Sequence, residues 1–63
     1  MNIHVSKEIQ DRWPGYNFLG KPFQLRNKRK YIRAYSIIYE CVHFYDFEND
    51  WFHHEKEDIL SDS

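Results

Sequence analysis

The sequence predicts a mostly β protein: a small single-domain antiparallel barrel or curled sheet with an irregular or short helical N-terminal segment. With 63 residues the chain has room for one domain, 1–63, near the size at which a core becomes hard to build. Twelve of the residues are Phe, Tyr or Trp, whose large rings can supply that core. From Tyr31 onward Tyr, Ile and Val dominate and Gly and Pro are absent, which is strand composition.

Residues 1–22 are expected to be irregular or briefly helical. Ser6 can cap a helix of one or two turns that places Ile9 and Trp13 on one face and ends at Pro14-Gly15. A second punctuation, Gly20-Lys21-Pro22, follows in an irregular stretch that bears aromatic residues. Residues 1–22 would then close one end of the sheet.

Strands are expected within residues 23–60. A short strand over 23–26 precedes a polar turn over 27–30, and a longer strand covers 31–39. A break near Glu40-Cys41 is needed because a strand continuing to residue 47 would exceed the usual length. Two further strands, 42–47 and 51–56, flank a loop at 48–50. Residues 57–60 form a short turn that places Ile59 and Leu60 on the barrel, and 61–63 form a frayed tail.

The length of the loop at 48–50 sets the register of the last hairpin. A three-residue loop places Phe47 opposite Trp51, Tyr45 opposite His53, and His43 opposite Glu55. A two-residue loop shifts every pair by one. The sequence alone leaves the register open, although it lacks the Asn-Gly pair that favours the shorter loop.

The stretch from Tyr31 to Leu60 resembles the later strands of Tudor-like modules and related small five-stranded barrels. The resemblance is carried by Ala34 and Ile37-Ile38 in an alternating strand, by residues 42–49, by Trp51 at the opening of a strand, and by Glu57-Asp58-Ile59-Leu60. Tyr45-Asp46-Phe47-Glu48-Asn49 occupies the place of the family's aromatic, Asp, aromatic, Gly, Asn segment, with Glu48 in place of the Gly.

The resemblance implies a role for Tyr45 and Phe47. They would form part of an aromatic cage for a methylated Lys or Arg, held by attraction between the cation and the ring faces. The competing interpretation is that both rings fill the core, which so small a domain most needs.

Charge is divided between the two halves of the chain. Residues 1–39 hold eight Lys or Arg and two acids, a formal +6, whereas residues 40–63 hold eight acids and one Lys, a formal −7. Such asymmetry indicates either a charged partner or two halves that face each other.

The acidic half carries the principal functional hypothesis, a non-enzymatic protein that docks on another protein. Carboxylates around exposed aromatic rings can bind a basic groove, as a phage-type regulator or inhibitor of a larger nucleic-acid-handling enzyme would. The alternative is a solubilising rim around a hairpin. The predicted protein-binding residues are Glu48, Asp50, Trp51, Phe52 and Glu55.

A run of basic residues between positions 26 and 33, the basic run, is the basis of the alternative function, single-stranded nucleic-acid binding. Its cations can contact phosphates while its tyrosines stack on bases. A solvated hairpin turn, or a cationic surface paired with the protein's own acidic half, explains the run equally well. A homodimer that joins opposite halves is a third reading, so we expect a monomer or a weak homodimer. The residues of this alternative are Arg26, Lys28, Arg29, Lys30, Tyr31 and Arg33.

No catalytic, metal or cofactor site is predicted. The metal-capable residues Cys41, His43, His53 and His54 match no zinc-site spacing. A pair of Cys41 with a histidine lacks an orienting group and an oxyanion-binding turn, so we expect no enzyme activity.

The compartment is predicted from what the sequence lacks. A single cysteine cannot form an internal disulfide, which fits a reducing cytoplasm. No stretch approaches the roughly 20 apolar residues of a membrane helix. Residues 1–10 also lack the apolar core of a signal peptide. A cytoplasmic protein without membrane contact is expected.

Overall fold

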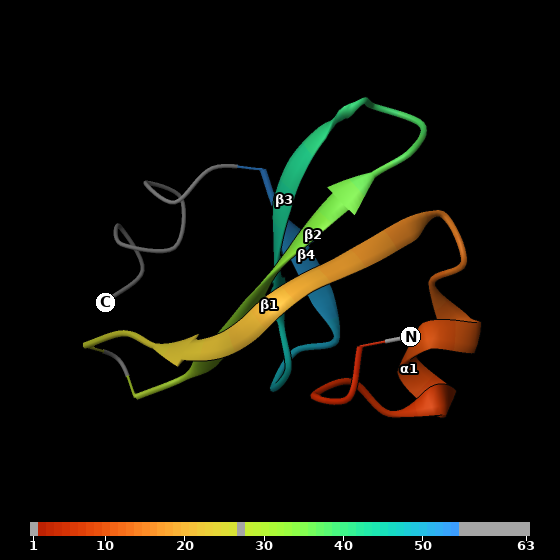
Figure 1. The fold of residues 1–63 in the computed structure, drawn as a ribbon. Coiled ribbons are helices and arrows are strands. Elements are labelled where there is room, and N and C mark those ends of the chain that lie inside the picture. Colours follow the sequence, from red (N-terminus) through yellow and green to blue (C-terminus); the bar gives the residue numbers. More distant parts are fainter. Residues whose placement is uncertain (1, 27, 55–63) are drawn as a thin grey trace.

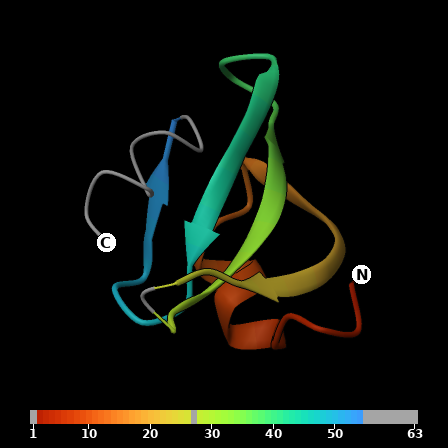
Figure 2. The same cartoon turned by 90° about the vertical axis from the view of Figure 1, so that its left-hand side faces the viewer.

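Four antiparallel strands form a single sheet in the computed structural model, which describes residues 2–26 and 28–54 (Figure 1). Each strand pairs with its neighbours in sequence, giving the order β1-β2-β3-β4. The sheet is curled (Figure 2), and within the described residues no strand joins β1 to β4. The predicted curled antiparallel sheet is therefore confirmed, in its open form. The elements are α1 (Lys7–Arg12), β1 (Tyr16–Gln24), β2 (Lys30–Ser36), β3 (Cys41–Asp46) and β4 (Trp51–His53).

The predicted N-terminal helix is confirmed as α1. The Ser6 hydroxyl accepts a hydrogen bond from the Ile9 backbone N–H at 3.3 Å, which caps the first turn. Trp13 ends the helix by donating its backbone N–H to the Ile9 carbonyl at 3.0 Å. Pro14 then prevents a further turn. Ile9 and Trp13 pack against the core, so the helix closes one side of the curled sheet.

The first strand was predicted to begin at Phe23, and this is wrong because β1 begins at Tyr16. Gly20-Lys21-Pro22 lies inside the strand, where the register with β2 shifts between Leu19 and Phe23. Gly20 has φ of +67°, a conformation that side chains disfavour, and Pro22 has no N–H to donate. The Gly-Lys-Pro signal therefore marks a β-bulge within a long strand instead of a loop before a short one.

The strand predicted over 31–39 ends earlier, because β2 stops at Ser36 and residues 37–40 form a turn. The register of the last hairpin, which the sequence left open, is shifted by one residue from the pairs that a three-residue loop would give. Phe44 faces His53, Tyr45 faces Phe52 and Asp46 faces Trp51, so the loop has four residues, 47–50. The Asp46 carboxylate explains this, since it accepts from the backbone N–H of Glu48 at 2.9 Å and folds the chain back one residue earlier.

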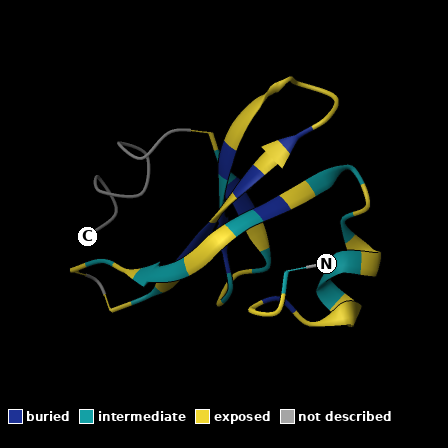
Figure 3. Ribbon diagram, in the orientation of Figure 1, coloured by how far each residue is buried: buried dark blue, intermediate teal, exposed yellow. Residues whose placement is uncertain are grey.

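The core lies inside the curl of the sheet (Figure 3). Buried residues occur on both faces of the sheet, because the adjacent residues Tyr31 and Ile32 in β2, and Tyr45 and Asp46 in β3, are all buried. No helix among the described residues is long and apolar enough to cross a membrane. The predictions for residues 55–63, including Glu55 and the turn at 57–60, lie outside the described residues. The buried apolar cluster comprises Val5, Phe18, Ile32, Ala34, Tyr45 and Phe52.

Candidate functional site, an aromatic pocket

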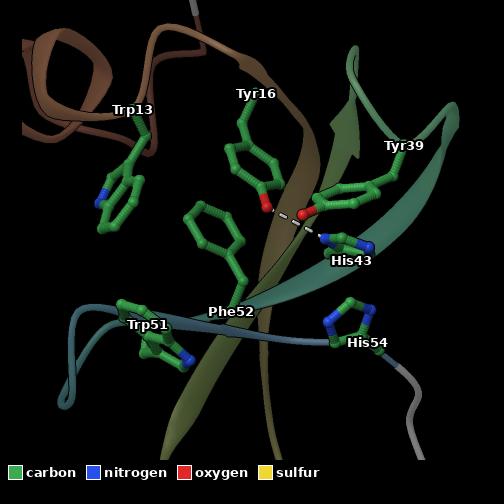
Figure 4. A pocket seen from close by; sticks show the side chains of 7 residues that line it. All are labelled: Trp13, Tyr16, Tyr39, His43, Trp51, Phe52 and His54. Carbon is green, nitrogen blue, oxygen red and sulfur yellow. Dashed lines mark hydrogen bonds between the residues drawn. The ribbon is translucent and has the colours of Figure 1, made fainter.

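Aromatic and imidazole rings line an open cavity of about 220 Å³ on one side of the molecule (Figure 4). They come from four parts of the chain: the end of α1 with the start of β1, the turn between β2 and β3, β3 itself, and β4 with the residue after it. We call this cavity the aromatic pocket. Its lining residues are Trp13, Tyr16, Tyr39, His43, Trp51, Phe52 and His54.

The floor of the aromatic pocket is built from rings in mutual contact. Tyr16 and Phe52 are stacked, with ring centroids 3.7 Å apart and planes inclined by 7°. Trp13 meets Phe52 edge-on at 5.1 Å. Phe52 belongs to the buried cluster, so this floor is continuous with the core and is held in place by it.

Two exposed rings stand on opposite sides of the opening (Figure 4). On one side the Trp51 ring lies edge-on to Trp13 at 6.1 Å and remains 64% exposed. On the other side Tyr39 approaches His43 at 5.6 Å between ring centroids and remains 65% exposed. A ligand in the cavity would therefore contact ring faces that water otherwise covers.

The orientation of Trp13 is fixed by Asp50. The indole Nε1–H donates to the Asp50 Oδ1 at 3.0 Å, and the Tyr45 hydroxyl donates to the same oxygen. The Arg12 Nε lies 3.1 Å from the other carboxylate oxygen. The hydrogen bonds from Tyr45 and Trp13 lower the pKa of Asp50, whereas burial and the neighbouring carboxylate raise the pKa of Tyr45 to about 12. Asp50 thus remains ionised and acts as an anchor behind the pocket.

His43 lies at the inner end of the pocket and is 1% exposed. Its Nδ1 is 3.1 Å from the Tyr16 hydroxyl, and its Nε2 is 3.3 Å from the Cys41 sulfur, so both ring nitrogens have partners. Burial, and secondly the neighbouring His54 ring at 4.5 Å, lower the pKa of His43. The imidazole is therefore neutral at pH 7 and places no positive charge in the pocket.

The predicted protein-binding residues take different roles in the structure. Trp51 lines the opening as an exposed ring, and Phe52 forms the floor. Asp50 faces inward to its anchoring partners, and Glu48 lies 3.3 Å from the Arg29 guanidinium. The two predicted aromatic residues, Trp51 and Phe52, thus lie at one site. The predicted acids Asp50 and Glu48 instead contact residues of the same chain.

The aromatic cage implied for Tyr45 and Phe47 is not formed by them. Tyr45 is 1% exposed and packs edge-on against Phe18 at 5.5 Å, so its face is closed to a ligand. Phe47 is half-buried and contacts Tyr45 at 5.2 Å. Both rings serve the core, which was the competing interpretation.

The basic run is only partly available to a ligand. Tyr31 is buried, so the prediction that it stacks on a base is wrong. The Arg29 guanidinium lies 3.3 Å from Glu48 and 3.9 Å from the buried Asp46 carboxylate, which ties it to the acidic half. The remaining cations are exposed: Arg26, Lys28, Lys30 and Arg33.

Sequence reasoning missed most of the aromatic pocket. Only Pro14-Gly15 separates Trp13 from Tyr16 in the sequence. A turn at these two residues would keep both rings close together, and this was the one signal available for them. Tyr39 gave none, because it was assigned to a strand that in fact ends at Ser36. Only the meander topology brings the turn at 37–40 and residues 51–54 to the same cavity.

No group of His, Cys, Asp and Glu within residues 2–26 and 28–54 is placed to hold a metal ion. Cys41 and His43 contact each other, and His54 lies beside His43, but these residues are not arranged as a metal-binding group. No protein-family model, curated protein or solved structure matches this chain, so its assignment rests on the residues and geometry described above.

Proposed function

We propose that this protein is a non-enzymatic binding module that holds a cationic side chain of a partner protein in the aromatic pocket. The observation that carries the proposal is the convergence of five aromatic rings from separate segments on one open cavity. Trp51 and Tyr39 stay exposed at its opening although both are large and apolar. Exposed aromatic rings above a rigid floor are typical anchors of a binding interface.

The charge around the pocket favours a cation as the occupant. No Lys or Arg lines the cavity, and the neutral His43 adds no positive charge. The Asp50 carboxylate accepts from the Trp13 indole N–H, which makes that ring more electron-rich. A cation over a Trp or Tyr face gains roughly 0.5 to 2 kcal/mol per contact, depending on how far it is desolvated. A methylated Lys or Arg is the form of this cation that we propose, because its methyl groups add apolar contact with the rings while the positive charge is kept.

The turn between β2 and β3 extends the proposed interface beyond the pocket. Ile37 and Ile38 are exposed beside Tyr39, and the Ile38 side chain approaches Gly15 next to the pocket floor. Such apolar contacts would add area around the anchored side chain, as an interface needs. The narrower hypothesis of a regulator or inhibitor of a nucleic-acid-handling enzyme stays a prediction.

Short peptides that differ only in one central residue test the proposal. The residue is trimethyllysine, lysine or a neutral tert-butyl isostere, and binding is followed by tryptophan fluorescence because both tryptophans line the pocket. We expect trimethyllysine to bind best and the neutral isostere least. Trp51→Ala should weaken binding about tenfold, the equivalent of about 1.4 kcal/mol.

The matched control is Ile3→Ala, which removes a fully exposed apolar side chain outside the pocket lining and should leave affinity unchanged. Circular dichroism checks that each variant folds. Equal affinity for the cationic and neutral peptides, or undiminished binding by Trp51→Ala, would contradict the proposal.

A further inference from the structure

We infer that the β1–β2 hairpin carries a second binding site, which takes single-stranded nucleic acid through phosphate contacts and one stacked base. The hairpin lies within the longest acid-free part of the chain, since no Asp or Glu occurs from residue 12 to residue 39. A shallow hollow of about 370 Å³ lies on it, separate from the aromatic pocket. The hollow is lined by His4, Lys21, Pro22, Phe23, Gln24 and Lys30.

Two cations, Lys21 and Lys30, line this hollow, and the guanidinium of Arg33 lies beside the bulge in β1. Lys21 lies in the bulge, and Lys30 is paired in register with Gln24 across the hairpin. The Arg33 Nη2 is 3.3 Å from the position that a Cβ on Gly20 would occupy, so its guanidinium lies over the bulge. A regular strand would have carried residue 21 at a different position relative to β2.

These cations are free to bind an anion. Lys21, Lys30 and Arg33 are exposed, and within residues 2–26 and 28–54 none of them forms an ion pair. This distinguishes them from Arg12 and Arg29, whose guanidinium groups approach Asp50 and Glu48. Unpaired cations grouped on one hairpin are complementary to a row of phosphates.

Phe23 supplies a platform for a base. Its ring is half-buried and is supported by Tyr31 and by Phe44, each with a centroid 6.0 Å away. These contacts hold the ring in the lining of the hollow, which Lys21 and Lys30 share. Single-strand binders combine a cationic track with such rings, whereas a duplex hides the base faces that stack. The combination favours a single strand over a duplex or an acidic protein.

The first test measures binding of a labelled oligothymidylate of about ten nucleotides by fluorescence anisotropy over a series of salt concentrations. If about three phosphates are neutralised at roughly 0.7 per phosphate, the slope of log K against log salt should be near −2. No binding at low salt, or a slope near zero, would overturn the inference.

Charge reversal locates the site. At about 100 mM salt, where the Debye length is about 10 Å, Lys30→Glu should weaken binding about tenfold. The matched control is Lys7→Glu, the same charge change on α1, which lies at the other end of the molecule from the hairpin turn (Figure 1). It should change affinity less than about threefold at that screening. Equal loss in the two variants would overturn the assignment to this hairpin.

Phe23→Leu separates stacking from charge. Leucine keeps the apolar packing but removes the ring, so we expect affinity to fall about threefold or more while the salt slope is unchanged. A polyglutamate of matched charge and a duplex of matched length serve as competitors and should bind less well than the single strand. Equal competition by either would contradict the base contact. Because these variants leave Trp13 and Trp51 intact, failure here does not bear on the aromatic pocket.

Discussion

Asp46 shows how a single acidic residue can organise a hairpin. Its side chain is fully buried, and its carboxylate accepts from the backbone N–H groups of Glu48 and Asn49 and from the Asn49 amide at 2.7 Å. Arg29 and His53 lie within 4.0 Å of the same carboxylate. A buried carboxylate with this many donors fixes both the loop length and the register of β3 and β4.

Replacing Asp46 should therefore cost more stability than replacing its exposed neighbour. Asp46→Ala is expected to destabilise the fold by about 3 kcal/mol, because it leaves several donors without an acceptor. Glu48→Ala, which removes an exposed ion-pair partner of Arg29, should cost less than about 1 kcal/mol. Urea unfolding of both variants measures the difference, and similar losses in the two would contradict the role given to Asp46.

His43 makes stability depend on pH below neutrality. Burial lowers its pKa in the folded protein from the ordinary 6.5, so the unfolded chain binds the additional proton first as the pH falls. Its contribution is thus complete above pH 6.5 and is lost as the pH drops through the lowered folded value. Thermal unfolding between about pH 7.5 and pH 5 should show a falling midpoint.

The exposed His4 provides the control for this pH dependence. His4→Asn should leave the trend in place, whereas His43→Gln should flatten it. An NMR titration of the wild-type histidines gives the same information without a variant. A His43 resonance that titrates at or above 6.5 would contradict the assignment.

The turn between β2 and β3, at 37–40, and the turn between β3 and β4, at 47–50, are built in the same way. Each follows a buried polar residue whose side chain accepts from the turn backbone: Ser36 from Tyr39 at 3.1 Å, and Asp46 from Glu48 at 2.9 Å. Each ends at a residue with positive φ, 56° at Glu40 and 53° at Asp50. Asp tolerates this conformation better than Glu does.

Glu40 is consequently a place where stability can be gained. Glu40→Gly should stabilise the fold by about 0.5 to 1 kcal/mol, because glycine adopts positive φ without a steric penalty. In a domain of this size that corresponds to a midpoint about 2 to 8 °C higher. Glu40→Ala, which keeps the Cβ, is the control and should give no such gain. A destabilised Glu40→Gly would show that the Glu40 side chain matters more than its backbone conformation.

The elements differ in how well the sequence predicts them. The helix was predictable because Ser6, Ile9 and Pro14 are local signals. The long β1 was not, since Gly20-Lys21-Pro22 is equally compatible with a loop and with a bulge, and only pairing with β2 decides. The last register depended on whether the Asp46 side chain would fold back on the loop, which sequence spacing does not reveal.

At the scale of the whole molecule, part of the charge asymmetry is resolved by contact between the two halves. Arg12 pairs with Asp50, and Arg29 approaches both Asp46 and Glu48. This was one of the two interpretations that the sequence left open. Lys21, Lys30 and Arg33 on the β1–β2 hairpin form no ion pair within residues 2–26 and 28–54, and we propose that they carry the second site.

The fold of the whole chain, and not a local sequence motif, brings the rings of the aromatic pocket together. Trp51 was selected from the sequence because it is an aromatic residue among acids. Trp13 and Tyr39 lie far from it in the chain and reach it only through the packing of α1 and the turn at 37–40. The sequence therefore predicted the side of the pocket formed by Trp51 and Phe52. It placed the aromatic cage at Tyr45 and Phe47, whose rings pack in or against the core.

The most direct measurement is a titration of the isotope-labelled protein with the trimethyllysine peptide, followed by NMR at the two indole N–H signals. Both tryptophans line the pocket, and the Trp13 N–H is bonded to Asp50, so each signal reports on the cavity. We predict that both signals shift and saturate together, and that the neutral isostere leaves them in place. Indole signals that stay unchanged while another surface shifts would contradict a cation-binding aromatic pocket.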